Sequence, residues 1–274
     1  MVLDWPVTEL EQALRASLPA CAVEVVPSVD STNTELMRRA RAARLVPTLL
    51  VAEQQTAGRG RLGRSWLSHA AAPAEGRSAT PGLLPSLTFS VGMPLAPADW
   101  SGLSLAVGVS VARALHPALG LKWPNDLWLQ DRKLAGILIE TAATSTGADG
   151  GRFVVVGVGI NIAPRDPAGL STAPACLQEL LPELDAPAVL ARVAPPLVQA
   201  LRLFEAQGFA AFHAEFDRRD VLRARSVQLS DGVTGTAAGV DGRGALLVHT
   251  SAGMKLVNSA EVSVRPVAAR HGEH

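Results

Sequence analysis

The sequence predicts an α+β fold, with a large body of helices and strands followed by a small β-rich domain. Three observations support this. The chain has 274 residues, 48% of them hydrophobic, enough for a sizeable core without disulfides. Helical and strand-like apolar patterns succeed one another along the body. From Leu222 onward the segments are short, apolar and separated by glycine turns, as in a small β-barrel. We therefore expect a body over 1–220, a β domain over 221–268 and a tail over 269–274.

The first half of the body has helix and strand patterns in alternation. Thr32 followed by Glu35 fits a helix-capping box, and Leu36, Met37 and Ala40 then form an apolar stripe at helical spacing. In chain order, we expect a helix over 9–18, a strand over 23–26, the helix from Thr32, and strands over 48–53 and 87–91. Between the last two strands lies His69–Pro85, which is rich in Ala, Pro, Gly and Ser, and we expect this segment to be mobile.

The second half continues in the same way. The dipeptide Pro195-Pro196 interrupts a long helical pattern, so we expect a break there. The expected elements are a helix over Asp99–Leu115, extended segments over 121–123, 127–129 and 133–140, a strand over 153–162, helices over 186–207 and 209–218, and five C-terminal segments, SVQL, GTAAGV, GALLVHT, GMKLV and EVSVRP.

Composition excludes several classes of protein. Lysine plus arginine equals aspartate plus glutamate, 25 each, whereas nucleic-acid binders usually carry a basic excess. Any anion site must therefore be local. Cys21 and Cys176 form neither a disulfide framework nor a metal motif. No apolar run is long enough to span a membrane, and the acidic start is no signal peptide. We expect a cytoplasmic protein.

The loop GRGRLGRSW, residues 58–66, carries three arginines and three glycines before Trp66. Glycines let backbone approach a ligand, and arginines hold anionic oxygens in a fixed fork, so the loop favours a phosphate-bearing ligand. Its glycines also fit the dinucleotide fingerprint, but that motif needs a following helix, which the prolines and glycines of the next segment exclude. A solvated basic loop is the other alternative.

Three further segments carry candidate ligand-binding residues. Ser31, Thr32 and Asn33 lie at a helix N-terminus, which either attracts an acceptor group or is a plain cap. In KWPNDLWLQDRKLAGILIE, residues 122–140, a hairpin would bring two lysines to one site; an edge-strand gatekeeper and ordinary turn chemistry are the alternatives. In FVVVGVGINI, residues 153–162, a buried amide needs a partner, either backbone or a heterocycle.

Together these segments predict one site for two anions. Activation of a carboxylate by a nucleoside triphosphate needs such a site, because fixed cations hold two mutually repelling partners and stabilise the charge that develops on the α-phosphate. The sequence therefore indicates an enzyme that forms an acyl-phosphate bond.

The motifs STN (31–33), QTAGRGRLGRSW (55–66), KWPNDL (122–127), KLAGILIE (133–140) and GVGINI (157–162) resemble, in order, those of biotin protein ligases. The resemblance implies a mixed-sheet catalytic domain of the biotin/lipoate ligase type and a C-terminal SH3-like β-barrel. It implies ATP and Mg²⁺, formation of biotinyl-5′-AMP, and transfer to a lysine of the biotin carboxyl carrier protein of acetyl-CoA carboxylase. A free sheet edge would pair with the carrier or with a second copy in a homodimer.

Residue roles follow from the same motifs. Lys133 would hold the biotin carboxylate, and Asp126 would orient the acceptor amine or a metal. The implied catalytic residues are Lys133, Arg61, Asp126 and Lys122; those for biotin are Ser31, Thr32, Asn33, Gln55, Arg59, Gly60, Arg61, Lys133 and Gly136; those for ATP are Arg59, Arg61, Arg64, Trp66, Lys122, Asn125 and Asn161.

Some alternatives remain open. Thirty residues precede the STN motif, too few for the DNA-binding domain of many relatives, so we expect no DNA partner. Without a long apolar run, we expect no membrane partner either. Lipoate and octanoate ligases share the architecture, so fold alone does not decide the acid. A biotin sensor without activity is the other class, against which Lys133 and Arg61 argue.

Overall fold

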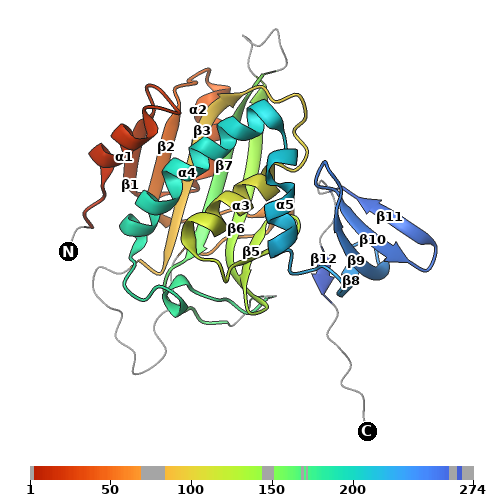
Figure 1. Ribbon diagram of the computed structural model, residues 1–274. Coiled ribbons are helices and arrows are strands. Elements are labelled where there is room, and N and C mark those ends of the chain that lie inside the picture. Colours follow the sequence, from red (N-terminus) through yellow and green to blue (C-terminus); the bar gives the residue numbers. More distant parts are fainter. Residues whose placement is uncertain are drawn as a thin grey trace.

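The computed structural model describes residues 3–68, 84–143, 151–167, 170, 172–258 and 264–266. Its centre is a seven-stranded mixed sheet in the order β1-β2-β3-β7-β6-β5-β4 (Figure 1). Only the β1–β2 pair is parallel among the described strands; the other neighbours are antiparallel. The strands are β1 (Ala22–Val29), β2 (Thr48–Gln55), β3 (Ser86–Leu95), β4 (Gly120–Lys122), β5 (Asp126–Leu129), β6 (Arg132–Ala143) and β7 (Arg152–Asn161).

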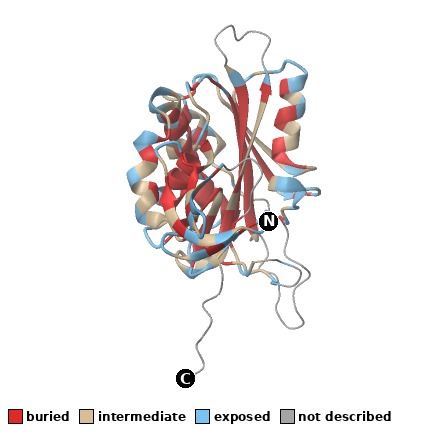
Figure 2. Cartoon of the chain, turned by 90° about the vertical axis from the view of Figure 1, so that its right-hand side faces the viewer, coloured by how far each residue is buried: buried red, intermediate tan, exposed pale blue. Residues whose placement is uncertain are grey.

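The helices cover the two faces of this sheet unequally. Four of them, α1 (Val7–Leu14), α3 (Leu103–Leu115), α4 (Ala186–Gln207) and α5 (Ala210–Arg219), lie on one face, and α2 (Thr32–Arg41) lies on the other (Figures 1 and 2). A single helix cannot cover a seven-stranded sheet, so part of the α2 face remains for a cavity.

Strand β7 shows how one segment serves both faces. Val154, Val156, Val158 and Ile160 belong to the main core beneath the four helices. The alternate residues point the other way because successive side chains of a strand face opposite sides. Phe153 and Val155 pack in the smaller core beneath α2, and the remaining positions, Gly157, Gly159 and Asn161, line the cavity. This alternation explains the GVGIN motif.

Five shorter strands form the C-terminal domain, which lies beside α5 (Figure 1). They are β8 (Ser226–Leu229), β9 (Thr234–Val240), β10 (Leu246–Thr250), β11 (Gly253–Val257) and β12 (Val264–Pro266), in the order β11-β10-β9-β8-β12. The Trp123 indole Nε1 donates to Gly244 O at 3.0 Å and joins this domain to the body. The sheet is antiparallel but open, because its end strands β11 and β12 are not paired with each other among the described residues.

The α+β prediction is confirmed, with local corrections. The expected break at Pro195-Pro196 is wrong: α4 runs continuously from 186 to 207. The flanking residues Val193, Ala194, Leu197 and Val198 are fully buried, and this packing outweighs the cost of the prolines.

Other corrections concern ends and caps. The cap of α2 is Ser31 rather than Thr32, and Glu35 contacts Arg38 and Arg39. Helix α3 begins at Leu103 because Gly102 has a left-handed φ of 78°, and α1 ends at Leu14. Of the segment expected to be mobile, only Leu84 and Pro85 lie among the described residues, and the predicted tail lies outside them.

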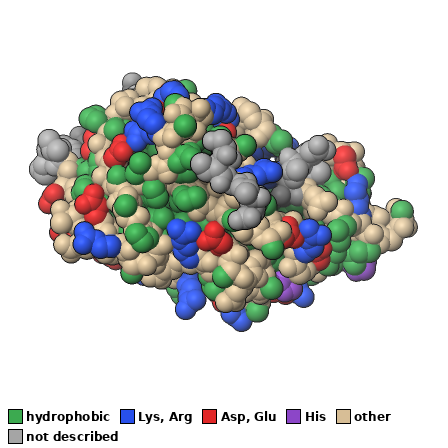
Figure 3. Space-filling view, turned by 90° about the horizontal axis from the view of Figure 1, so that it is seen from above, with side chains coloured by type: hydrophobic (Ala, Val, Ile, Leu, Met, Phe, Trp, Pro, Cys, Tyr) green, Lys and Arg blue, Asp and Glu red, His purple; other side chains and the backbone are tan. Residues whose placement is uncertain are grey.

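Charges of both signs are interspersed on the face of the molecule seen in Figure 3. Seen from above, lysine, arginine and acidic side chains alternate without a large single-sign patch (Figure 3), in keeping with the formal net charge of zero. Among the described residues, no helix is both long and apolar enough to cross a bilayer.

Candidate active site

A cavity of about 300 Å³ lies on the sheet face that α2 leaves uncovered. All the residues to which the sequence assigned a site role line it, from four separate parts of the chain. They are Ser31, Thr32, Asn33, Gln55, Arg59, Gly60, Arg61, Arg64, Trp66, Lys122, Asn125, Asp126, Lys133, Gly136 and Asn161. Arg61 and Lys133, on which the two-anion hypothesis depends, are therefore walls of one cavity.

One end of the cavity is uncharged and polar. The start of α2 places Thr32 next to Gln55 on β2: the Thr32 backbone N–H donates to Gln55 Oε1 at 2.8 Å, and its hydroxyl lies 3.2 Å from the same oxygen. The Ser90 Oγ of β3 lies 2.7 Å from Thr32 Oγ1 and from Asn33 Oδ1. These side chains are buried, so their mutual hydrogen bonds fix a rigid polar surface.

Asn33 fastens α2 to the sheet. Its Nδ2 donates to Leu138 O at 3.2 Å and to Glu140 Oε2 at 3.0 Å, both on β6. A Cβ at Gly157 would lie only 2.1 Å from Asn33 Oδ1, so β7 has a glycine where this amide crosses it. Both polar atoms of Asn33 thus have protein partners in the structure.

The opposite end carries a carboxylate between two ammonium groups. The turn between β4 and β5 sets Lys122 opposite Asp126, and the β5–β6 turn returns Lys133 to the same place. Lys133 Nζ lies 2.6 Å from Asp126 Oδ1, and Lys122 Nζ lies 3.9 Å from Oδ2. Burial lowers the pKa of Lys122, and the neighbouring Asp126 opposes that effect. The hairpin predicted from the sequence brings both lysines to one site.

The arginine turn, defined as residues 58–66, is a preformed hairpin-like structure. Gly60 N donates to Arg64 O at 2.7 Å, Trp66 N donates to Gly58 O at 2.8 Å, and a 3₁₀ turn (Arg61–Gly63) forms its tip. The Arg61 Nη1 donates to Asn125 Oδ1 at 3.4 Å, and burial lowers the pKa of this guanidinium. The turn therefore crosses the cavity toward the charged end.

Trp66 and Asn161 occupy the middle of the cavity. The indole lies against Gly159, where a Cβ would come within 2.4 Å of Cε2. The Lys133 Nζ and Arg165 Cζ each lie 6.0 Å from the ring centroid. Its Nε1 is buried without a hydrogen-bond partner among the described residues, which leaves a donor for a ligand.

The Asn161 amide bonds to backbone through Nδ2 and to a side chain through Oδ1. Its Nδ2 donates to Ala175 O at 3.0 Å and to Lys133 O at 3.2 Å, and its Oδ1 accepts from Arg165 Nη1 at 2.8 Å. The amide thereby holds the start of β6, and with it Lys133, against the segment 173–175.

Sequence reasoning missed four residues at or beside the cavity. Glu140 shares the strand face of Gly136 and Leu138, so the two-residue period of β6 was a usable signal. Ser90, Arg165 and Arg265 carry no local signal. Arg265, on β12 of the C-terminal domain, lines the cavity more than one hundred residues along the chain from the lysines.

The described residues do not form a metal site made of protein ligands alone. No cluster of three or more His, Cys, Asp or Glu side chains occurs within the described part of the chain. Asp126, which the motifs assign to the acceptor amine or a metal, contacts Lys122 and Lys133 in the structure. What the arrangement fits is an elongated ligand with a hydrogen-bonding end, an anionic end and an aromatic contact between them.

Comparison with known proteins agrees with this description. Residues 78–161 match the family model of the biotin/lipoate A/B protein ligase family, which defines the class. Residues 225–265 match the biotin protein ligase C-terminal domain. The chain is 36% identical over 256 residues to the bifunctional ligase/repressor BirA of Escherichia coli, covering 89% of this chain and 74% of that one.

Two further relatives agree. The biotin–[acetyl-CoA-carboxylase] ligase of Paracoccus denitrificans is 33% identical over 262 residues, 85% of this chain and 96% of its own. A structure of the Aquifex aeolicus biotin protein ligase in complex with biotin and ATP superposes with a TM-score of 0.71 at 30% identity, covering 89% and 99% of the two chains. The chain belongs to the biotin protein ligase family.

Gly157→Ala tests the polar end of the cavity. The new methyl group would displace the Asn33 amide, so we expect a loss of about 1–3 kcal/mol in the free energy of unfolding and weaker ligand binding. Denaturant titration and calorimetry measure both. Gly151→Ala is the matched control, because its methyl group would meet only ordinary contacts; equal stability of the two variants would contradict the role given to Gly157.

Proposed function

We propose that this protein is an ATP-dependent biotin–protein ligase. The observation that most directly supports this proposal is the cavity that joins the polar Thr32–Gln55 end to Arg61 and Lys133. Membership of the family and the likeness to a relative with bound biotin and ATP support the choice of substrates. In this proposal residues 1–220 form the catalytic unit and 221–268 the C-terminal unit, which contributes Arg265 to the cavity.

In the first half-reaction a carboxylate oxygen of biotin attacks the α-phosphorus of ATP, and pyrophosphate leaves. Attack requires two anions to meet, and the charge that builds on the phosphate oxygens requires fixed cations. Lys133 holds the carboxylate, and Arg61, Arg64 and Lys122 serve the phosphates. Trp66 packs against adenine, with Asn125 and Asn161 beside it. In the second half-reaction the acceptor lysine attacks the acyl carbon and AMP leaves.

The polar end would receive the ureido ring. That ring has two N–H donors and one carbonyl acceptor, and Ser31, Thr32 and Gln55 present hydroxyl and amide groups to it. Gly60 and Gly136 leave space beside the ligand. Asn33 and Arg59, given biotin contacts by the motifs, act in this proposal by holding the wall and the arginine turn.

Magnesium would enter with the triphosphate as part of the substrate, since the described residues offer no metal cluster. Asp126 then serves to hold the two lysines and to orient the incoming amine. The acceptor partner is a biotin carboxyl carrier protein, as the names of the relatives suggest. Strand β1 ends the sheet, and its outer edge offers backbone groups to the carrier or to a second copy.

Mass spectrometry of a carrier domain tests this function directly. The carrier is incubated with the protein, ATP, magnesium and one of biotin, lipoate or octanoate. We expect the mass increase of biotin on one lysine and no addition of the other acids. Modification by lipoate or octanoate instead would assign the other ligase activity, and biotin binding without any modification would make the protein a sensor.

Lys133→Ala separates catalysis from binding. Loss of the ammonium removes charge stabilisation in the transition state, so we expect biotin-dependent ATP–pyrophosphate exchange to fall by about 10²–10³ in kcat. Biotin affinity, measured by calorimetry, should fall much less. Equal losses in both would make Lys133 an affinity group only.

Lys122→Arg tests the electrostatics of the site through pH. A solvated lysine has a pKa of about 10.4. Burial lowers the pKa of Lys122, so its ammonium loses its proton at a lower pH than a solvated lysine does. Exchange should therefore decline as pH rises through that lowered pKa, and arginine, which stays protonated, should move the decline to higher pH. Pyrophosphate exchange isolates the first half-reaction from titration of the acceptor lysine.

The same shift has a consequence for stability. Because the pKa of Lys122 in the folded state lies below its pKa in the unfolded state, the folding penalty of charged Lys122 is complete below the folded-state pKa and is relieved as pH rises above it.

The control for the exchange experiment with Lys122→Arg is Lys255→Arg, on the exposed Lys255–Asp231 pair. Identical pH profiles for wild type and Lys122→Arg would exclude Lys122 from the reaction.

A further inference from the structure

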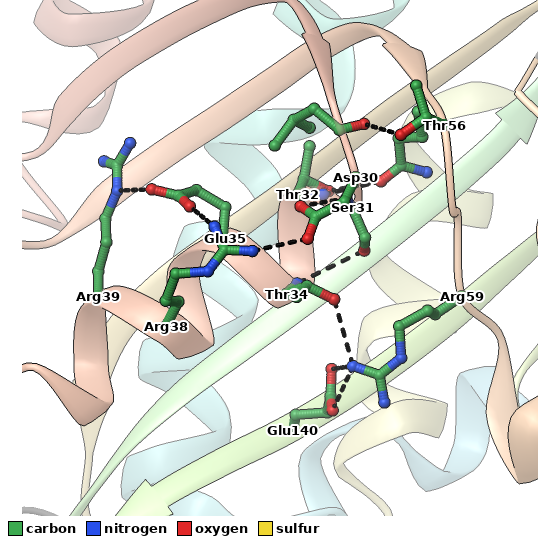
Figure 4. A network of polar contacts seen from close by, with 12 residues as sticks. Asp30, Ser31, Thr32, Thr34, Glu35, Arg38, Arg39, Thr56, Arg59 and Glu140 are labelled. Carbon is green, nitrogen blue, oxygen red and sulfur yellow. Dashed lines mark hydrogen bonds and ion pairs between the residues drawn. The ribbon is translucent and has the colours of Figure 1, made fainter.

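The arginine turn is anchored at two points on opposite sides of the cavity. Its tip contacts the β4–β5 turn through Arg61 and Asn125. At its base, Arg59 contacts β6 and α2 (Figure 4). The Arg59 Nη1 lies 3.1 Å from Glu140 Oε1, 3.3 Å from Oε2 and 3.4 Å from Thr34 Oγ1. The turn thus spans the site as a strap with a fixed base.

Glu140 connects this base to the wall of the cavity. The same carboxylate accepts from Arg59 and, at 3.0 Å through Oε2, from the Asn33 Nδ2. Asn33 is itself buried and held by Ser90 and by Leu138 O. One acidic side chain therefore joins the arginine turn to the start of α2 and to β6.

The Arg59–Glu140 ion pair is stronger than the exposure of Arg59 alone indicates, because Glu140 is more buried. The Arg59 side chain is 48% exposed, and an ion pair between two such groups is worth little. The Glu140 side chain is only 20% exposed and already held by Asn33, so less side-chain entropy is lost when Arg59 joins it. Thr34 gives the guanidinium a second acceptor.

The three arginines of the turn face different partners. Arg59 is directed to Glu140, which offsets its charge, whereas Arg61 and Arg64 extend the turn toward Asn125 and the lysine pair. The base of the turn then determines where Arg61 lies.

We infer that Glu140 is a positioning residue that holds the arginine turn over the cavity through Arg59. This rests on the proposed biotin ligase function and assigns the residue that keeps Arg61 in place for the carboxylate and the phosphates. Removing the contact loosens the base of the turn, so that biotin binds less tightly while the chemistry of the bound complex is little changed.

Glu140→Gln is the main test, because glutamine keeps an acceptor for Asn33 and removes the charge that attracts Arg59. Biotin-dependent pyrophosphate exchange should show a KM for biotin raised by about fivefold, near the upper limit for a partly exposed pair, with kcat within about twofold of wild type. Limited digestion with trypsin, followed by mass spectrometry, should show faster cleavage after Arg61 and Arg64.

Two further variants make the result specific. In Arg59→Gln the same changes are expected, and the double variant should be no worse than either single one, since both remove one contact. Glu35→Gln is the matched control: this carboxylate is also 20% exposed and pairs with arginines on α2, away from the turn. It should leave the KM and the cleavage after Arg61 and Arg64 unchanged.

The outcomes separate the two proposals. Absence of biotin-dependent exchange in the wild type would reject the ligase function. With an active wild type, a Glu140→Gln variant that matches it in KM and in cleavage of the turn would overturn the positioning role. A lowered melting temperature with additive effects in the double variant would also overturn it, because Glu140 would then act on the whole fold.

Discussion

The placement of Asp126 between two lysines is the interaction on which the site depends. Cations removed from water are costly, by several kcal/mol each in a dry interior, unless a counter-charge is near. The carboxylate lies 2.6 Å from Lys133 Nζ and 3.9 Å from Lys122 Nζ, and its charge also acts on Arg61. One carboxylate facing several cations leaves an excess of positive charge. The carboxylate thus offsets part of the cost of burying these cations, and the remaining positive charge attracts anions.

The sheet provides the geometry that this charge needs. Lys122, Asp126 and Lys133 lie on adjacent antiparallel strands joined by tight turns, so the hydrogen-bonded register sets their separation. The polar end is set independently by α2 crossing β7 at Gly157. Because both ends rest on the same sheet, the distance between them is fixed before any ligand arrives, which is preorganisation of the kind that catalysis requires.

The sequence was most informative where function depends on short contiguous motifs. The arginine turn, the two lysines and the Ser31–Asn33 segment each had a structural explanation, but together they predicted one site for two anions and resembled the motifs of one family in order. The structure brings them to one cavity. The two-residue period of β6 places Glu140 on the strand face of Gly136, but neither Glu140 nor Ser90 shows in the sequence which distant side chain it meets. Arg265 was missed because its position depends on how the C-terminal domain packs.

The errors in the fold have the same origin. Pro195 and Pro196 predict a helix break locally, yet the burial of their neighbours maintains α4. Similarly, the sequence left open whether the buried Asn161 amide bonds backbone or a heterocycle, and its hydrogen bonds in the structure are made to Lys133 O, Ala175 O and Arg165. In each case a long-range contact outweighs a local preference, and such contacts cannot be read from one sequence.

The two ends of the cavity contribute differently to the choice of acid. The cationic end fits any carboxylate with a nucleotide and does not discriminate biotin from lipoate or octanoate. The polar end does: the exposed fractions of Ser31, Thr32 and Gln55 are 2%, 3% and 6%. An alkyl chain or a dithiolane ring placed there would make no hydrogen bonds to this polar surface, although it would displace the water that otherwise contacts it. A ureido ring would hydrogen-bond to this surface, so in the function proposed above selectivity for biotin would arise at the end of the cavity remote from the chemistry.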